Sequence, residues 1–61
     1  MIYKELPKDP VMLLSFVNTQ LRDFYPNLED FCLSFHINKK ELTDKLLSID
    51  YSYEEGLNQF V

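Results

Sequence analysis

Hydrophobic residues recur at helical spacing through the first third of the chain. Asp9 followed by Pro10 is typical of a helix start, because the carboxylate accepts hydrogen bonds from free backbone N–H groups and proline suits the first helical position. The pattern predicts a helix from about Pro10 to Phe24, ended by Tyr25-Pro26. One broad face of this helix carries the residues expected to enter the core: Leu13, Leu14, Val17, Leu21 and Phe24.

Two shorter helices are expected next. Asn27 can cap the first of them, whose apolar positions are Leu28, Phe31, Cys32 and Phe35. Residues 36–38 then make a tight connection, and Asn38 with Glu41 resembles a capping box in which Asn replaces the usual Ser or Thr. The third helix should therefore span about Lys39 to Ser48 and bury Leu42, Leu46 and Leu47.

From residue 49 the hydrophobic period changes from helical to two. Apolar residues alternate with polar ones at Ile49, Tyr51 and Tyr53, which predicts a strand. Residues 54–57 would form a turn in which Gly56 adopts a positive φ, and residues 58–61 would return as a second strand. The alternative is a fourth short helix capped by Ser52, with apolar residues at helical spacing: Tyr53, Leu57 and Phe60.

The expected fold class is mainly α. Two short helices joined by three residues, after a longer helix, form a three-helix, helix-turn-helix-like domain, and the C-terminal β-hairpin would be a small wing. All 61 residues fit one domain, residues 1–61, because a chain this short buries only about 60% of the surface that it exposes when unfolded.

Two segments of the chain carry a family resemblance: LPKDPVMLLSFVNTQLRD at residues 6–23 and YSYEEGLNQFV at residues 51–61. Together they resemble a family of short bacterial proteins of unknown function, the domain of unknown function numbered 4250. The resemblance covers nearly the whole chain and implies a bacterial source and a stand-alone domain. It brings no activity, substrate or catalytic residue to these positions.

Cysteine content and the absence of targeting signals bear on the cellular compartment of the protein. Ten acidic residues against six basic ones give a formal net charge of −4, and Cys32 is the single cysteine. An intrachain disulfide is therefore impossible, which favours a reducing compartment. The first residues lack the apolar core and cleavage site of a secretory signal, and no run reaches transmembrane length. We expect a cytoplasmic protein that does not interact with membranes.

The residues that could carry chemistry are few. Cys32 and His36 lie four apart, but Cys32 falls on the apolar face and no second cysteine or histidine completes a metal site. The acidic pairs Glu29-Asp30 and Glu54-Glu55 are explained by a helix start and a turn. A single glycine cannot form a glycine-rich phosphate loop. We expect no enzyme, no catalytic residue, no cofactor, no metal and no small-molecule substrate.

DNA binding is the alternative function that a helix-turn-helix invites. Its candidate contacts lie on the third helix: Lys39, Lys40 and Lys45. Because Glu41, Asp44 and Asp50 lie among these lysines and the chain is acidic, the pattern shows no basic face that would displace counterions from phosphates. Nucleic-acid binding, or a transcription-associated role, is thus the second choice.

Protein association has a more specific signal in the first helix. Met12 and Phe16 form an apolar pair at i, i+4 spacing, opposite the expected core face. Either the N-terminal arm or the hairpin covers the pair, or the pair is a hydrophobic patch for a second subunit or another protein. We expect a small cytoplasmic interaction domain that binds a protein partner or itself as a homodimer, with Met12 and Phe16 as the candidate interface.

Overall fold

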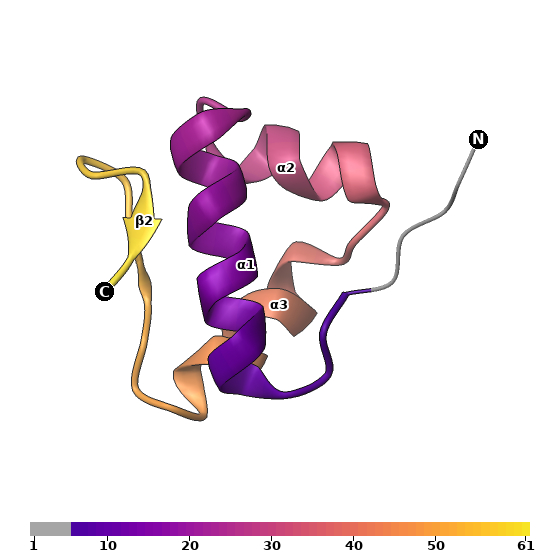
Figure 1. The fold of residues 1–61 in the computed structure, drawn as a ribbon, viewed down its shortest axis with the longest axis vertical. Coiled ribbons are helices and arrows are strands. Elements are labelled where there is room, and N and C mark those ends of the chain that lie inside the picture. The colour runs from indigo at the N-terminus through magenta and orange to yellow at the C-terminus, as the bar shows by residue number, and fades with distance from the viewer. Residues whose placement is uncertain (1–5) are drawn as a thin grey trace.

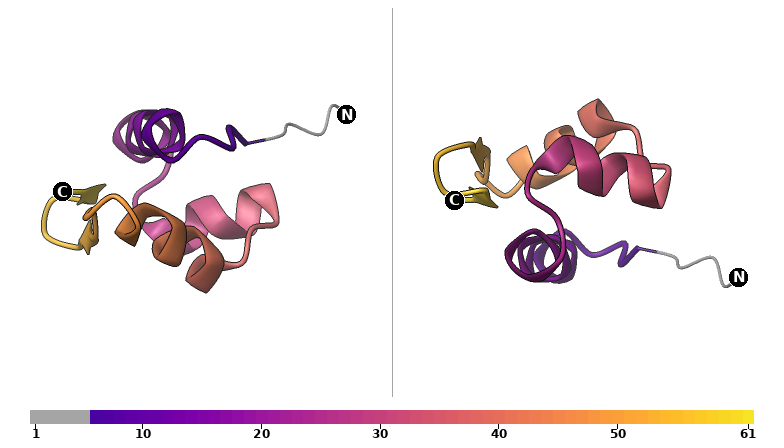
Figure 2. Two further views of the ribbon diagram at one scale, coloured as in Figure 1. Left: turned by 90° about the horizontal axis from the view of Figure 1, so that it is seen from below. Right: turned by 90° about the horizontal axis from the view of Figure 1, so that it is seen from above.

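The computed structural model describes residues 6–61. Its elements in chain order are α1 Pro10–Asp23, α2 Leu28–Phe35, α3 Lys39–Leu47, β1 Tyr53–Glu54 and β2 Gln59–Phe60. Helices α2 and α3 form a layer on one side of α1, and the hairpin lies beside α1 at the edge of that layer (Figure 1 and Figure 2). The predicted mainly helical class with a C-terminal hairpin is confirmed, and the alternative of a fourth helix is wrong.

The three helices begin where the sequence predicts. Each is preceded by a side chain that accepts a hydrogen bond from the backbone N–H three residues further on: Asp9, Asn27 and Asn38, at 3.1, 2.8 and 3.0 Å. These bonds satisfy N–H groups that have no partner inside the helix. No helix within residues 6–61 is long and apolar enough to cross a membrane.

The turns that follow α2 and α3 each contain a residue in the left-handed region, His36 with φ 57° and Asp50 with φ 68°. After α2, the N–H of Ile37 donates to the Cys32 carbonyl at 2.9 Å, and after α3 the N–H of Tyr51 donates to the Leu46 carbonyl at 3.0 Å. These are Schellman endings, which satisfy carbonyls left free at a helix C-terminus. The second ending occupies residues 48–50, so the strand that was predicted from Ile49 is shorter and begins at residue 53.

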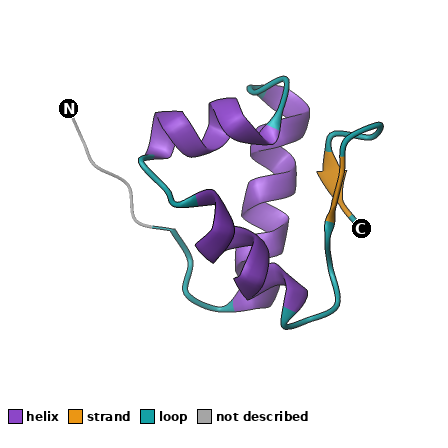
Figure 3. Ribbon diagram, turned by 180° about the vertical axis from the view of Figure 1, so that it is seen from behind, coloured by secondary structure: helices purple, strands orange, loops and turns teal. Residues whose placement is uncertain are grey.

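The hairpin is antiparallel, with Tyr53 opposite Phe60 and Glu54 opposite Gln59 (Figure 3). Ser52 and Val61 extend it by one pair, since each donates its backbone N–H to the carbonyl of the other, at 3.0 and 2.9 Å. The prediction for the turn was wrong in one respect, because Gly56 does not have a positive φ. Asn58 does, at 53°, as asparagine tolerates this region better than most residues.

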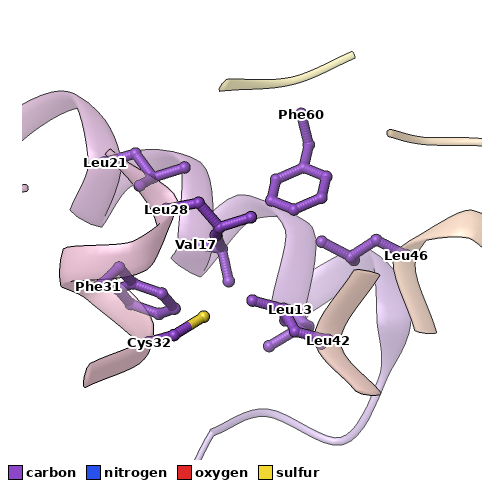
Figure 4. Packing of buried hydrophobic residues seen from close by; sticks show 9 residues of the cluster. All are labelled: Leu13, Val17, Leu21, Leu28, Phe31, Cys32, Leu42, Leu46 and Phe60. Atoms are coloured by element: carbon purple, nitrogen blue, oxygen red, sulfur yellow. The ribbon is translucent and has the colours of Figure 1, made fainter. Parts of the chain in front are cut away.

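Within residues 6–61, nine side chains form the buried core: Leu13, Val17, Leu21, Leu28, Phe31, Cys32, Leu42, Leu46 and Phe60. Phe60 brings the hairpin into this core, where its ring reaches toward Leu46 (Figure 4). Two predicted core residues are instead exposed, Phe24 by 68% and Leu47 by 58%. Phe24 leaves the helical path at the end of α1. Leu47 is turned by about 100° from the buried Leu46 beside it.

Candidate interaction surface

The side chain of Asn18 closes the outer edge of β2. Because the neighbouring pairs of the ladder bond to each other, Phe60 has its backbone N–H and carbonyl pointing away from β1. The Asn18 carboxamide matches both groups: Oδ1 accepts from the Phe60 N–H at 2.8 Å, and Nδ2 donates to the Phe60 carbonyl at 3.1 Å. The amide thus takes the place of a third strand and attaches the hairpin to α1.

Asn58 makes a second attachment at the other end of the hairpin. Its Nδ2 donates to the backbone carbonyls of Leu21 and Tyr25, at 3.0 and 2.9 Å, and so caps the C-terminal end of α1. Its Oδ1 accepts a hydrogen bond from the Tyr53 hydroxyl at 2.6 Å. Partial burial raises the pKa of Tyr53. Asn18 and Asn58 therefore hold the hairpin against α1 at two points along its length.

This attachment leaves an open groove between α1 and the hairpin, of about 980 Å³. We call it the α1–hairpin groove. Buried Leu21 and Phe60 are among its lining residues. Four large apolar side chains that line it are exposed to solvent: Val11 by 62%, Tyr51 by 37%, Leu57 by 61% and Val61 by 48%. Among the residues in 6–61 that line the groove, the one charged side chain is Arg22, whose guanidinium binds the carboxylate of Asp23. The groove is therefore an exposed, nearly uncharged surface.

The structure separates the two residues of the predicted interface. Met12 is 62% exposed and is not among the residues that line the groove. Phe16 is partly buried and packs edge-on against two rings of α2, with centroids 6.5 Å from Phe31 and 5.8 Å from Phe35. Helix α2 covers Phe16, so this ring contributes to packing within the chain and does not form an exposed patch with Met12.

The lysines proposed as nucleic-acid contacts are mostly paired with carboxylates. Lys39 binds Glu29, and Lys40 binds Asp44 at 3.2 Å. The hydrogen bond from Lys39 lowers the pKa of Glu29, and the same bond raises the pKa of Lys39. Only Lys45 of the three makes no ion pair with a residue in 6–61. The three lysines lie on α3, as predicted, but two of the charges are neutralised locally.

Cys32 and His36 lie in different environments. Cys32 is 6% exposed inside the core, and this burial raises the pKa of its thiol. His36 is exposed in the left-handed position that ends α2. Within the described part of the chain, no three His, Cys, Asp or Glu side chains come close enough to hold a metal ion. The arrangement fits a buried thiol that is protected from reaction.

The α1–hairpin groove was missed by reasoning from the sequence, and so was the role of Asn18. A weak signal existed for Asn18, because asparagine has a low helix propensity and this one lies in the middle of a predicted helix. Leu57 carried a different signal, as an apolar residue in a predicted turn. Neither signal indicates which distant segment of the chain Asn18 or Leu57 contacts.

Comparison with known proteins gives one finding about the family. The model of a family described as a domain of unknown function (DUF4250) matches residues 7–60, which confirms the resemblance noted in the sequence. Neither a curated protein nor a solved structure matches the chain.

Proposed function

Because this chain belongs to the DUF4250 family, whose description assigns no activity, we propose a function from the geometry alone: the domain binds a protein surface through the α1–hairpin groove. The observation that supports this is the gathering of four exposed apolar side chains on one nearly uncharged groove. Single exposed apolar residues are ordinary on proteins, whereas several that line one groove are typical of an interaction site. We further propose that the domain acts in the cytoplasm, where its single thiol stays reduced.

The energetics support association of moderate strength. Full burial of a Val or Leu side chain is worth about 1.5–3 kcal/mol. Val11 and Leu57 are both close to two-thirds exposed. Covering each of them by a partner should therefore contribute roughly half to two-thirds of this burial free energy. Part of this gain offsets the cost of ordering side chains and of association. The groove thus supports a reversible contact.

The shape of the groove favours a protein surface over a small molecule. Ligand pockets bury about 70–90% of a small ligand, which requires walls that enclose it. Val11 and Leu57 line the groove and yet stay more than 60% exposed, so the walls are open. Nucleic acid has less support, since Lys39 and Lys40 are engaged by carboxylates and Arg22 is engaged by Asp23.

A photo-crosslinking amino acid placed at single positions tests the proposal in cells. Position 57 lies in the groove, and position 33 is the matched control, because Leu33 is 75% exposed on α2 and does not line the groove. We expect a discrete protein adduct from position 57 and none from position 33. Val11→Asp should reduce the adduct from position 57. An equal yield at both positions, or no adduct at position 57, would contradict the proposed function.

A further inference from the structure

We infer that the hairpin, residues 52–61, is a flap that detaches from α1 as one cooperative unit while the three helices stay folded. The joint of the flap lies between Tyr51 and Ser52. Detachment removes one wall of the α1–hairpin groove and uncovers the part of the core that Phe60 covers. Because this motion belongs to the chain itself, the inference stands whether or not a protein binds in the groove.

The backbone hydrogen bonds of the chain divide at this joint. The N–H of Tyr51 donates to the Leu46 carbonyl at 3.0 Å, so Tyr51 belongs to the ending of α3. Ser52 instead exchanges backbone hydrogen bonds with Val61, which makes it the first residue of the hairpin. Among residues 6–61, no backbone-to-backbone hydrogen bond joins residues 52–61 to a helix. The hairpin can therefore leave α1 without breaking its own ladder or any backbone bond inside the helices.

The attachment of the hairpin to the helices is small. Its hydrogen bonds within residues 6–61 are the four made by the side-chain amides of Asn18 and Asn58. Its apolar part consists of the buried Phe60 ring and the partly buried Tyr53 ring, whose centroids are 5.5 Å apart. Figure 1 shows the hairpin at the edge of the molecule, connected to α3 by one extended stretch of chain.

The helices share a larger set of contacts with one another. Apart from Phe60, all the buried core residues of the described chain come from α1, α2 and α3. Segments with few buried apolar contacts open at a lower free energy than the core elements of the same protein. A two-stranded hairpin is marginally stable by itself, so its order depends on its attachment to the helices. Opening of the hairpin should therefore precede unfolding of the helices.

Opening gives the α1–hairpin groove two states. In the attached state the groove has residues of α1 on one wall, such as Val11, and residues of the hairpin on the other, such as Leu57. In the detached state the second wall is missing. A partner that contacts both walls would bind the attached state alone and would suppress the opening by mass action. The flap therefore couples occupancy of the groove to the order of the C-terminal segment.

Amide hydrogen exchange of the full 61-residue chain, followed by NMR in low concentrations of urea, tests the inference. The amides of Ser52, Phe60 and Val61 should share one opening equilibrium that depends weakly on urea, since little surface is exposed. Their protection factors should be at least about tenfold lower than those of Val17 and Leu46, whose exchange requires unfolding of helices.

A pair of glycine variants examines the attachment. Asn58→Gly removes the two bonds to α1 and its C-terminal turn, and glycine accommodates the positive φ of this position. It should lower the protection of the hairpin amides at least about tenfold, while far-UV circular dichroism still shows folded helices. Glu55→Gly is the matched control, because it places a glycine in the same turn and Glu55 makes no side-chain hydrogen bond within residues 6–61. Its effect should be much smaller.

Three outcomes would each overturn the inference. The first is equal protection and equal urea dependence of hairpin and helix amides in the wild type, because the hairpin would then open only when the whole chain unfolds. The second is an equal effect of the two glycine variants. The third is loss of the helices in Asn58→Gly. The crosslinking test of the groove is separate, since the absence of an adduct from position 57 would leave the flap intact.

Discussion

The attachment of the hairpin to α1 through Asn18 can be tested by the substitution Asn18→Ala. The variant loses two hydrogen bonds to Phe60, of 2.8 and 3.1 Å. Each is worth about 0.5–1.5 kcal/mol net, and a backbone group left without a partner beside the buried ring adds to that cost. The better helix propensity of alanine recovers up to about 0.7 kcal/mol. We therefore expect a loss of about 2 kcal/mol in the free energy of unfolding.

A loss of this size is large for so short a chain. Native stability of about 0.05–0.15 kcal/mol per residue corresponds to roughly 3–9 kcal/mol for this domain. At about 4–8 °C per kcal/mol for domains of this size, the midpoint of thermal unfolding should fall by about 8–16 °C. Thermal unfolding followed by far-UV circular dichroism measures the midpoint. Thr19→Ala is the control, because Thr19 is the next residue on α1 and makes no side-chain hydrogen bond within residues 6–61.

Amide hydrogen exchange in the same variants examines the hydrogen bond itself. The Phe60 N–H should exchange faster in Asn18→Ala than the global loss of stability explains, because its acceptor is gone. A midpoint within about 3 °C of the wild type, together with unchanged protection of the Phe60 amide, would refute the reasoning. The hairpin would then be held by the Phe60 side chain and by the bonds from Asn58 to the carbonyls of Leu21 and Tyr25.

Three further predictions concern the core, the thiol and acid stability. Phe16→Ala should lower the free energy of unfolding by about 2–3 kcal/mol, because it removes an aromatic contact with α2. Met12→Ala, at an exposed site, should change the free energy of unfolding by less than about 0.5 kcal/mol. Urea unfolding measures both values. The Cys32 thiol should react with a thiol reagent much more slowly in the native state than in denaturant, since it is buried; equal rates would contradict a structural role. Lys39 lowers the pKa of Glu29 in the folded state. The contribution of this pair to the free energy of unfolding should therefore be present above the unfolded carboxyl pKa of 4.5 and be lost as pH falls through the folded pKa. An NMR titration should show the Glu29 pKa rising in Lys39→Met, and an unchanged pKa would rule out the ion pair in solution.

The starts of the helices and the centre of the core were predictable because their signals are local. Asp9, Asn27 and Asn38 cap backbone groups three residues away, so a short stretch of sequence contains both partners. The periodic spacing of residues such as Leu13 and Val17 likewise defines one buried face without reference to any other element.

The ends of the helices were less predictable. Left-handed endings are usually marked by glycine, but here they fall on His36 and Asp50, and the single glycine lies elsewhere with an ordinary φ. The hydrogen bonds and packing around these endings offset the cost of the conformation. For the same reason the strand predicted from Ile49 begins later, since the ending of α3 uses residues 48–50.

The sequence by itself determined where the helices begin, which stripe of α1 is buried and that the C-terminal segment alternates as a hairpin does. Only the tertiary structure decided which side chains hold that hairpin and which apolar residues stay outside. Asn18 and Phe60 are 42 residues apart, and no local pattern encodes the match between a side-chain amide and the free edge of a strand. The α1–hairpin groove also depends on tertiary structure, because the packing of the hairpin against α1 determines how exposed Val11 and Leu57 are.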